Sequence, residues 1–595
     1  MILETMKISL KRNWRGLLIF LVAVLFFMGT AGYNYLATRD GMVKWGAPDE
    51  NANYVFAKLF AQTGKLQIFE KYNLLVNDII VPRSFRSDLG MMKPMSFLGM
   101  TIIYGEIAHF IGIGVLPYLT PFFASLGIIF LYFALKKVFH PNNALISSLL
   151  LAAFPPYIYY SCRSMFHNVL FVVFIIISFN FLLEMTGKDR RYQRLAYSAL
   201  AGLFFGFGVA TRTSELMWLL PVLLFVYLVN IFRVNILRVL IFLAFCGLAL
   251  LPSMYQNQIL YGSYFFGGYA EMNKSITTLS SASTQLVAIS VKGSFKQVGQ
   301  IFTKIEKTIF YFGFHPKQSL KMGYYYFANM FWWIFWPAFF GLIILLAQFK
   351  KVKRRHWIYL GAGFITSLIL IFYYGSWEFH DNPDPKSFTI GNSYTRYWLP
   401  MYICALPLAS LFIMKITSGL FKLISKKINF QKGEKFFSFN LRQPLFLGAT
   451  RAVLVILIMY ISLQFVLIGS AEGLVYTLGR QGPVKEEIKT VLASTESGSV
   501  IITQYHDKLF FPERKVINGL FDNDEMIKRY AILAKIIPVY YYNFTFPEKD
   551  FNYLNTRRLA PFGLKIEAVK RVNADFTLYR VSDGVTDVGS QISDF

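Results

Sequence analysis

The sequence has little charge for its length. Asp, Glu, Lys and Arg make up 16% of the 595 residues, against about 25% in an ordinary soluble domain. By contrast, 55% of the residues are hydrophobic and the mean hydropathy is +0.44. This shortage of charge excludes a soluble enzyme, a disordered chain and a nucleic-acid-binding protein with a water-exposed basic face. The composition instead indicates a polytopic membrane protein.

Cysteine is also scarce. The three cysteines, Cys162, Cys246 and Cys404, each lie within or at the end of an apolar run. Their number and spacing exclude a disulfide framework and a cysteine metal site. We interpret them as packing residues.

Long apolar stretches account for most of the first 470 residues. Eleven of them are each about the length that a helix needs to cross about 30 Å of hydrocarbon. They lie near residues 17–36, 117–135, 143–161, 168–183, 196–210, 215–231, 239–255, 324–347, 357–374, 397–414 and 452–470. The sequence predicts a mainly α fold, with about eleven transmembrane helices in a membrane domain over residues 1–470. The first stretch could also be a signal peptide, but its length and the ten later spans favour an uncleaved anchor.

The net charge of +27 lies between these stretches. Residues 471–595 carry 16 basic and 16 acidic side chains and contribute none of it. Six alternate connections carry 25 Lys and Arg against 4 acids. These connections are residues 1–16, 136–142, 184–195, 232–238, 349–356 and the basic loop 415–451. The positive-inside rule therefore predicts a multi-pass cell-membrane protein with a cytoplasmic N-terminus and an extracytoplasmic C-terminal domain.

Three connections on the predicted outer side carry further polar segments. In the first, residues 37–116, we expect a helix over Asn51–Gln62 and an amphipathic interfacial helix over Met95–Ile113. Counting the latter as a span would place the basic cluster Lys350–Arg355 outside. In the second, residues 256–323, we expect a helix around Phe295–Phe312. The third covers residues 375–396.

Residues 471–595 resemble a small soluble α/β domain. Helical patterns alternate with β-rich runs. The expected elements are helices at Gln481–Ala493 and Asp524–Lys535, and strands at Ser499–Thr503, Val539–Phe544 and Phe576–Val581. We interpret His506-Asp507-Lys508 as an ordinary polar turn.

The candidate site begins with the acidic pair Asp49-Glu50. It lies between Trp45, an expected interfacial anchor, and a helix that carries Tyr54. By the predicted topology, further polar residues from several segments approach the same membrane surface: Lys93, Arg163, His167, Arg212, Glu215, His380 and Arg396. Such a set indicates a site, because ionisable groups at span ends are costly unless they are used or paired. Each one alone could be a snorkelling anchor, and Arg212 could pair with Glu215 one helical turn away.

The order of several motifs resembles that of the GT-C glycosyltransferases, over roughly residues 15–410. The resemblance is to the branch that contains the protein O-mannosyltransferases and the lipid A aminoarabinose transferases. It rests on Pro48-Asp49-Glu50 followed by Tyr54, Lys93-Pro94, Lys136-Lys137, the Phe154–Ser161 run, Ala210–Thr213 and Tyr394–Pro400.

The resemblance implies transfer of a sugar, with inversion, from a polyprenyl-phosphate donor to an extracytoplasmic glycolipid, glycan or protein acceptor. It makes Asp49 the general base and Glu50 a second acceptor contact or the alternative base. Lys93 matches the family's carrier-phosphate contact, and Arg212 and Arg396 become partners for the same group. His380 is a weaker candidate for the donor; Tyr54, Arg163 and His167 complete the expected substrate-binding set.

This chain departs from the family pattern in the loop Ser161–Asn168, which carries no carboxylate where many relatives have one. That departure puts a two-acid mechanism in doubt. We expect no cofactor. A divalent cation, which some GT-C enzymes bind, would find hard ligands at Glu378, His380, Asp381 and Asp384; we prefer a metal-free site.

Two other classes of protein stay open. A flippase or transporter would carry charged or broken positions in the middle of its spans, whereas the ionisable groups here lie mostly at span ends. A non-catalytic envelope assembly protein is favoured only by the C-terminal domain. The substitution Asp49→Asn separates these classes, because a structural loop tolerates it and a general base does not.

Overall fold

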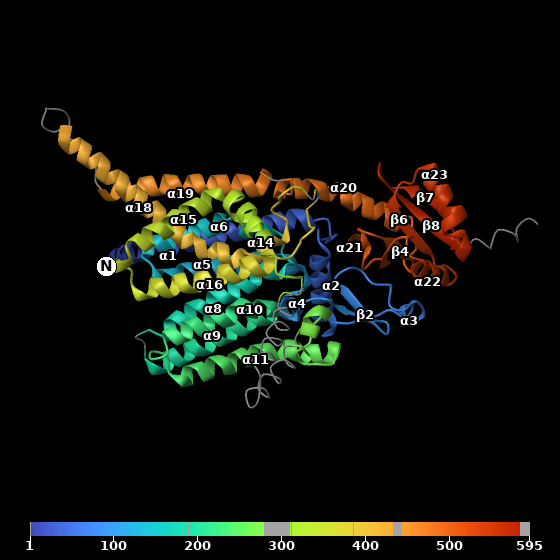
Figure 1. Ribbon diagram of the computed structural model, residues 1–595, viewed down its shortest axis with the longest axis horizontal. Coiled ribbons are helices and arrows are strands. Elements are labelled where there is room, and N and C mark those ends of the chain that lie inside the picture. Colours follow the sequence, from blue (N-terminus) through green and yellow to red (C-terminus); the bar gives the residue numbers. More distant parts are fainter. Residues whose placement is uncertain are drawn as a thin grey trace, which may run out of the picture. The chain divides into compact units, whose positions relative to one another are not determined.

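The computed structural model describes residues 2–187, 190–275, 277–278, 310, 312–382, 384, 386–431, 443–469 and 471–583. The chain forms two compact units, and each is assembled from segments that are far apart in the sequence (Figure 1). The helical unit comprises Met1–Asn34, Pro117–Ser253 and Lys274–Tyr476. The mixed unit comprises Tyr35–Leu116, Met254–Asn273 and Thr477–Phe595.

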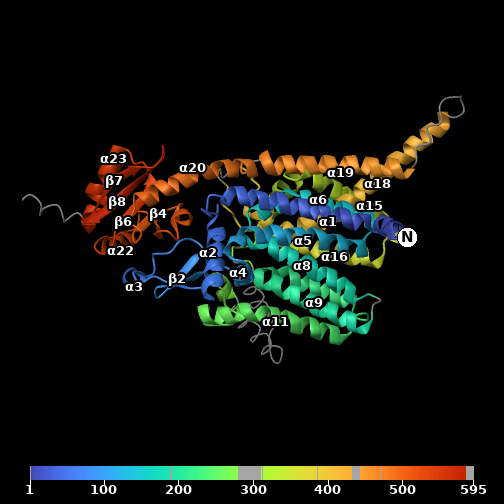
Figure 2. The ribbon, with the colours of Figure 1, turned by 180° about the vertical axis from the view of Figure 1, so that it is seen from behind.

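The helical unit is built from long apolar helices that run side by side (Figures 1 and 2). In chain order they are α1 (Ile2–Thr38), α5 (Leu116–Val138), α6 (Pro141–Ala153), α7 (Pro155–Cys162), α8 (His167–Met185), α9 (Arg191–Thr211), α10 (Leu216–Val229), α11 (Ile236–Tyr261), α14 (Pro316–Gly323), η3 (Tyr324–Asn329), α15 (Trp332–Ala347), α16 (Arg354–Gly375), α17 (Ser393–Tyr397), α18 (Leu399–Gln431) and α19 (Gln443–Ile468).

The expectation of a polytopic membrane protein is confirmed, but the count of eleven spans is not. Among the described residues, eight helices are long and apolar enough to cross a membrane, and the count reaches ten if each of two bent pairs is one span. The remaining expected span, 215–231, falls on the shorter apolar helix Thr213–Val229. The expected interfacial helix corresponds to α4 (Leu98–Ile111), which is also too short to be counted.

Proline and local unwinding account for the bent pairs. Helices α6 and α7 meet at an angle of 48° at Phe154. Pro155 follows directly, and a proline has no backbone N–H to continue the helix and disfavours helical geometry in the residue before it. The second pair, Pro316–Asn329 and Trp332–Ala347, is bent by 102°. Apolar runs of sufficient length therefore do not each make one straight span.

Small residues allow α9 and α11 to approach closely. A Cβ atom at Gly202 would lie 2.1 Å from the carbonyl oxygen of Phe242, and one at Gly206 would lie 2.5 Å from that of Cys246. Two glycines spaced by four residues place both gaps on the same face of α9, as in close helix pairs within membranes.

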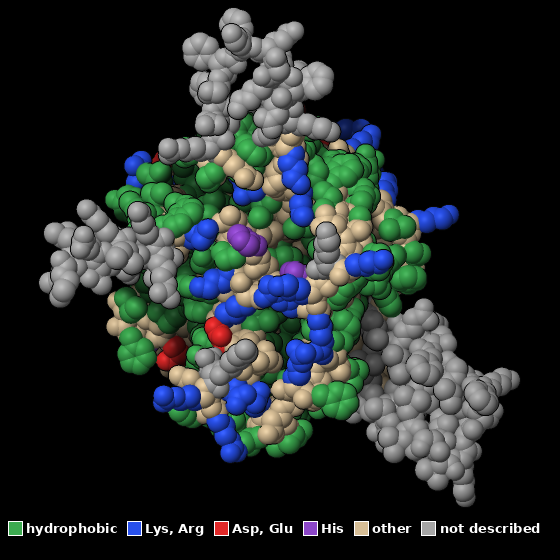
Figure 3. All heavy atoms as spheres, turned by 90° about the vertical axis from the view of Figure 1, so that its left-hand side faces the viewer, with side chains coloured by type: hydrophobic (Ala, Val, Ile, Leu, Met, Phe, Trp, Pro, Cys, Tyr) green, Lys and Arg blue, Asp and Glu red, His purple; other side chains and the backbone are tan. Residues whose placement is uncertain are grey.

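One face of the helical unit is strongly basic. Figure 3 shows Lys and Arg side chains over the end where the chain begins, with few Asp or Glu among them. Helix ends that contribute cations include the last turn of α5, with Lys136 and Lys137, and the start of α16, with Arg354 and Arg355. Arg355 donates to the Lys137 carbonyl, so these two helix ends lie together.

The mixed unit contains two sheets. The first outer segment supplies α2 (Pro48–Thr63), α3 (Asn73–Val76), α4 and a small antiparallel sheet of order β1-β3-β2, whose strands are β1 (Ile68–Phe69), β2 (Phe85–Asp88) and β3 (Met91–Pro94). The C-terminal segment forms a five-stranded sheet of order β5-β4-β6-β8-β7. Its strands are β4 (Val500–Thr503), β5 (Lys515–Asn518), β6 (Val539–Phe544), β7 (Leu564–Arg571) and β8 (Phe576–Asp583), and its helices are α20 (Leu474–Ala493), α21 (Asp507–Phe510), α22 (Asp524–Ala534) and α23 (Glu548–Tyr553).

The expected C-terminal α/β arrangement is confirmed. The three predicted strands and both predicted helices are present, and β5 and β7 are additional strands. The β1–β3 sheet was not expected from the sequence. The helix predicted around Phe295–Phe312 falls mostly outside the described residues.

The first outer segment and the C-terminal sheet share a hydrophobic core. Phe56 of α2 packs on Phe85 of β2 with ring centroids 4.7 Å apart, and Phe85 packs on Phe511 at 5.0 Å. All three side chains are buried. The burial of rings from three distant segments joins these elements into one folding unit.

Candidate functional site

The predicted acidic pair lies at the start of α2. Pro48 occupies the first turn, where a missing N–H costs nothing. The two acids occupy different surroundings: Glu50 is fully buried and accepts a hydrogen bond from the Ala47 N–H at 3.1 Å, whereas Asp49 is half-buried and accepts one from the Ser84 hydroxyl at 2.5 Å. Glu50 therefore caps the helix, and Asp49 is the more accessible carboxylate.

Tyr54 lies one turn further along α2. Its ring packs against Trp45, with centroids 5.9 Å apart. Burial raises the pKa of the Tyr54 hydroxyl above its ordinary value. Tyr54 thus stays protonated at neutral pH and supports the segment that leads into the acidic pair.

The hairpin of β2 and β3 places three charged side chains together. Arg86 is the direct partner of Lys93 across the antiparallel pair, and Asp88 follows Arg86 by two positions. Alternate residues of a strand share a face, so all three charges lie on one face of the hairpin. The turn residues Leu89 and Gly90 both have positive φ, as two-residue hairpins require.

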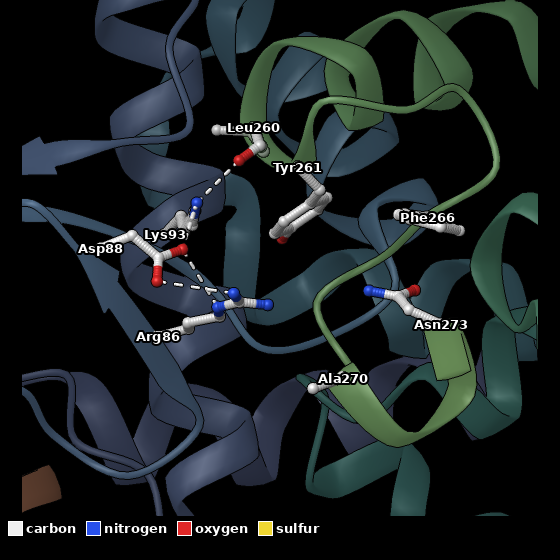
Figure 4. Close-up of a pocket in the computed structure, with 8 residues that line it drawn as sticks. All are labelled: Arg86, Asp88, Lys93, Leu260, Tyr261, Phe266, Ala270 and Asn273. Atoms are coloured by element: carbon white, nitrogen blue, oxygen red, sulfur yellow. Dashed lines mark hydrogen bonds and ion pairs between the residues drawn. The ribbon is translucent and has the colours of Figure 1, made fainter. Parts of the chain in front are cut away.

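These charges line a cavity of about 280 Å³ (Figure 4). The Lys93 ammonium lies 2.7 Å from the Asp88 carboxylate and donates to the Leu260 carbonyl at 2.8 Å. The Arg86 guanidinium lies 3.1 Å from the same carboxylate. Burial alone would raise the pKa of Asp88, but Lys93 and Arg86 hold it below its ordinary value. At neutral pH the cavity therefore contains two cations and one anion.

The opposite wall of the cavity is formed by residues 260–273. Tyr261, Phe266, Ala270 and Asn273 line it. This wall approaches the hairpin closely at Gly268, where a Cβ atom would lie 2.5 Å from the Pro94 carbonyl oxygen. The wall is therefore apolar and aromatic, opposite a charged hairpin.

The helical unit holds a second set of predicted residues. The Arg212 guanidinium lies 2.9 Å from the Glu215 carboxylate, and both residues are buried. Glu215 also accepts hydrogen bonds from the Tyr374 hydroxyl at 2.7 Å and the Trp218 indole at 2.6 Å. The predicted pairing of Arg212 with Glu215 is present, within a larger network.

Two further arginines lie against aromatic rings. The Arg396 guanidinium is 4.2 Å from the centroid of Phe166 and 5.1 Å from that of Tyr397. The Arg163 guanidinium also lies against Phe166, 4.9 Å from the ring centroid. His167 is the first residue of α8 and directly follows Phe166 in the sequence. Its side chain is buried. Arg212 completes the row, 4.7 Å from the Tyr397 centroid.

The structure does not bring the metal candidates together. His380 and Glu378 are both exposed and 3.9 Å apart. The Asp381 carboxylate accepts from the Ser393 backbone N–H, and Asp384 accepts from that of Lys386. Within the ranges that the structure describes, no three His, Cys, Asp or Glu side chains are grouped to hold a metal ion.

Sequence reasoning did not identify Ser84, Arg86 and Asp88. Ser84 touches Asp49, and the other two line the cavity of Lys93. The spacing Arg86-Ser87-Asp88 before Leu89-Gly90 carries the signal for a hairpin with two charges on one face, but it has no apolar alternation to mark it as a strand.

Residues 117–255 match the model of a family described as dolichyl-phosphate-mannose-protein mannosyltransferase. The sequence has no significant match among curated proteins.

Solved structures share the fold. ArnT from Cupriavidus metallidurans in the apo state is similar with a TM-score of 0.51 and 12% identity, over 94% of this chain and 97% of ArnT. The same protein bound to undecaprenyl phosphate gives 0.51 and 12%, over 95% and 98%. The Archaeoglobus fulgidus oligosaccharyltransferase tethered to an acceptor peptide gives 0.52 and 13%, over 90% of this chain and 69% of that one.

At such low identity these likenesses show the fold. Together with the family match, they confirm the resemblance drawn from the sequence. This chain is a multi-pass membrane protein with the fold of the GT-C glycosyltransferases.

Proposed function

We propose that this protein is a glycosyltransferase that moves a sugar from a polyprenyl-phosphate donor to an acceptor on the extracytoplasmic side. The observation that carries the proposal is the cavity in which Arg86 and Lys93 face an aromatic wall. A phosphate fits the two cations, and the wall suits the sugar or the lipid beside it. The ArnT structure bound to undecaprenyl phosphate supports this class of ligand.

The charge of the cavity favours a monophosphate-linked donor. Two cations and one carboxylate leave a net charge of +1, and a sugar joined to a lipid through one phosphate is a phosphodiester with one negative charge. When the bond to the sugar breaks, charge grows on the phosphate that leaves. Lys93 and Arg86 stabilise that charge, which lowers the barrier of the transfer step.

Asp49 is the proposed general base. The acceptor hydroxyl gives its proton to the Asp49 carboxylate while its oxygen attacks the anomeric carbon of the sugar. One bond forms from the acceptor oxygen, and the bond to the phosphate oxygen breaks on the opposite face, which inverts the configuration. We assign Asp49 rather than Glu50 to this step, because Glu50 is buried in its helix cap.

The residue that contacts the proposed base is close in sequence to a residue that lines the cavity. Ser84, which donates to Asp49, is two positions before Arg86. Two residues of extended chain span at most about 7 Å. Backbone positions 84 and 86 are therefore close together, and we propose that a sugar bound through its phosphate at Arg86 lies beside the carboxylate held at Ser84.

The arginine row of Arg163, Arg396 and Arg212 is proposed to contribute to substrate binding within the helical unit. We propose a cytoplasmic N-terminus, because the basic face of the helical unit lies where the chain begins (Figure 3). The donor sugar and the acceptor are left to experiment.

The test is sugar release by the purified protein in lipid vesicles. A panel of polyprenyl-phosphate sugars is incubated with a membrane extract as acceptor source, for wild type, Asp49→Asn and the control Asp550→Asn, whose carboxylate is exposed in α23. We expect release with at least one donor that Asp49→Asn reduces by about 10²- to 10⁴-fold and the control preserves. Equal release by both variants would exclude Asp49 as the base. No release from any donor by folded wild type would favour a transport or assembly role.

A further inference from the structure

A chain of contacts connects the C-terminal sheet to the proposed base. It runs from Asp507 in α21 to Arg83, from Arg83 to its neighbour Ser84, and from Ser84 to Asp49. All four residues belong to the mixed unit. Asp507 and Arg83 are 424 positions apart in the sequence.

The contact between Asp507 and Arg83 has several bonds. The Asp507 carboxylate is fully buried. It accepts hydrogen bonds from the Arg83 backbone N–H at 2.7 Å, from Nε at 3.0 Å and from Nη2 at 2.6 Å. Arg83 Nη2 also donates to the Tyr505 carbonyl at 2.8 Å. A buried carboxylate is costly unless it is bonded in this way. The contact fixes both the backbone and the side chain of Arg83.

Ser84 has an unusual backbone conformation. Its φ is +65°, in the left-handed region that non-glycine residues seldom adopt. The conformation is held from both sides: Arg83 is bound to Asp507, and the Ser84 carbonyl accepts from the Met95 N–H at 3.1 Å. It aims the Ser84 hydroxyl at the Asp49 carboxylate, 2.5 Å away. Strained residues of this kind cluster at functional sites.

Residues in and just after α21 also contact the segment that precedes Asp49. The Lys508 ammonium donates to the Gly46 carbonyl at 2.5 Å, and Lys44 pairs with Glu513 at 2.5 Å. The sequence reading of His506-Asp507-Lys508 as an ordinary polar turn therefore misses its role. Two of its three side chains bind the first outer segment, one on each side of the acidic pair.

We propose that Ser84 is a positioning residue for Asp49 and that Asp507 holds Ser84 in place through Arg83. The proposal rests on the assignment of Asp49 as base. A carboxylate bound through one oxygen cannot rotate freely, so its direction toward the acceptor hydroxyl is set before substrate arrives. The C-terminal α/β segment then supports catalysis without touching the substrate.

The decisive variant is Ser84→Gly. Glycine adopts a φ of +65° without strain, so the variant should fold at least as well as wild type. It lacks the hydroxyl, so we expect kcat to fall by about ten- to a hundredfold while the donor KM stays unchanged. The matched control is Leu89→Gly, since Leu89 also has a positive φ in the same hairpin and is 81% exposed. Its kcat should not change.

A double variant tests whether Ser84 acts through Asp49. In the Asp49→Asn background, Ser84→Gly should cause no further loss of residual activity. Full kcat in Ser84→Gly, with Asp49→Asn inactive, would overturn the positioning role and leave the proposed function intact. Full activity of Asp49→Asn would instead overturn the proposed function itself.

Asp507→Asn and Arg83→Lys test the C-terminal end of the contact chain. Asparagine removes the charge of the acceptor, and lysine keeps the cation without the several bonds of the guanidinium. Both should lower kcat with an unchanged donor KM. Two variants are needed because Asp507 is buried and its replacement could reduce folding. Wild-type kcat in either variant, with the fold verified by its thermal transition, would overturn the role of Asp507.

Discussion

The two compact units use their positive charges in different ways. In the helical unit, Arg396 and Arg163 lie against aromatic rings. In the mixed unit, Lys93 and Arg83 meet the carboxylates Asp88 and Asp507. An aromatic face holds a guanidinium without neutralising it, whereas a carboxylate cancels its charge and fixes its direction. Arg396 and Arg163 are thus held by rings, whereas the mixed unit also orients its cations with carboxylates.

Arg212, in the helical unit, meets both a ring and a carboxylate. We expect Glu215→Gln to lower the free energy of unfolding by about 3–5 kcal/mol, since it leaves a buried cation without its counter-charge. Thermal unfolding in lipid or detergent measures the loss. The control Glu378→Gln changes an exposed carboxylate and should unfold like wild type. A wild-type transition in Glu215→Gln would contradict a buried ion pair here.

Acid should destabilise the mixed unit through His506. Burial lowers the pKa of His506 to about 4, below about 6.5 in the unfolded chain. The neutral imidazole therefore contributes stability that is complete above about pH 6.5 and is lost as the pH falls toward 4. The loss reaches about 3 kcal/mol at most.

The variant His506→Gln isolates this effect. Burial raises the pKa of the neighbouring Glu487, which adds stability on acidification and partly offsets the loss. Between pH 7 and pH 5, the temperature of the thermal unfolding transition should fall less steeply in His506→Gln than in wild type. The exposed control His380→Gln should keep the wild-type slope. Equal slopes in all three proteins would be evidence against a buried neutral His506.

Asp88→Asn tests the charge balance of the cavity. The substitution changes the net charge of the three groups from +1 to +2. We expect the affinity for inorganic pyrophosphate to rise about fivefold relative to that for phosphate. The effect is small because the Asp88 side chain is 42% exposed and solvent screens its charge. Competition against donor binding measures the ratio. Asp40→Asn, in the same unit, serves as control, and an unchanged ratio in Asp88→Asn would argue against charge matching.

Arg396→Lys tests the aromatic contacts of the helical unit. Lysine keeps the charge but cannot stack on Phe166 and Tyr397 as a planar group. We expect a loss of about 0.5–1 kcal/mol in stability. Arg557→Lys, at an exposed position, should show none. A loss equal in both variants would mean that the rings contribute nothing.

The local elements of the fold are predictable from the sequence. The start of α2 is marked by Pro48 with acids in the first turn, and β6 by the run of β-formers Val539–Tyr542. Hydrophobic length predicts the spans, but a break at Phe154 and a bend of 102° after Asn329 depend on backbone breaks that length does not report.

The site is predictable only in part. Asp49 and Arg212 lie at the ends of helical segments, and Lys93 precedes an apolar one, so motif and position single them out. Arg86 and Asp88 belong to a hairpin without apolar alternation, so only their spacing before the Leu89-Gly90 turn marks their common face. The contact of Arg83 with Asp507 spans 424 positions, and no local pattern predicts a partner at that distance.

The most direct test measures kcat and donor KM side by side for Asp49→Asn and Lys93→Ala in vesicles, with Lys71→Ala as an exposed control. The account predicts that Asp49→Asn loses kcat and keeps donor affinity, because it removes the base alone. It predicts that Lys93→Ala raises the donor KM about ten- to a hundredfold, because a charged contact to phosphate contributes about 1.5–3 kcal/mol. Wild-type kinetic constants in both variants, with the fold intact, would contradict a base and a phosphate site in the mixed unit.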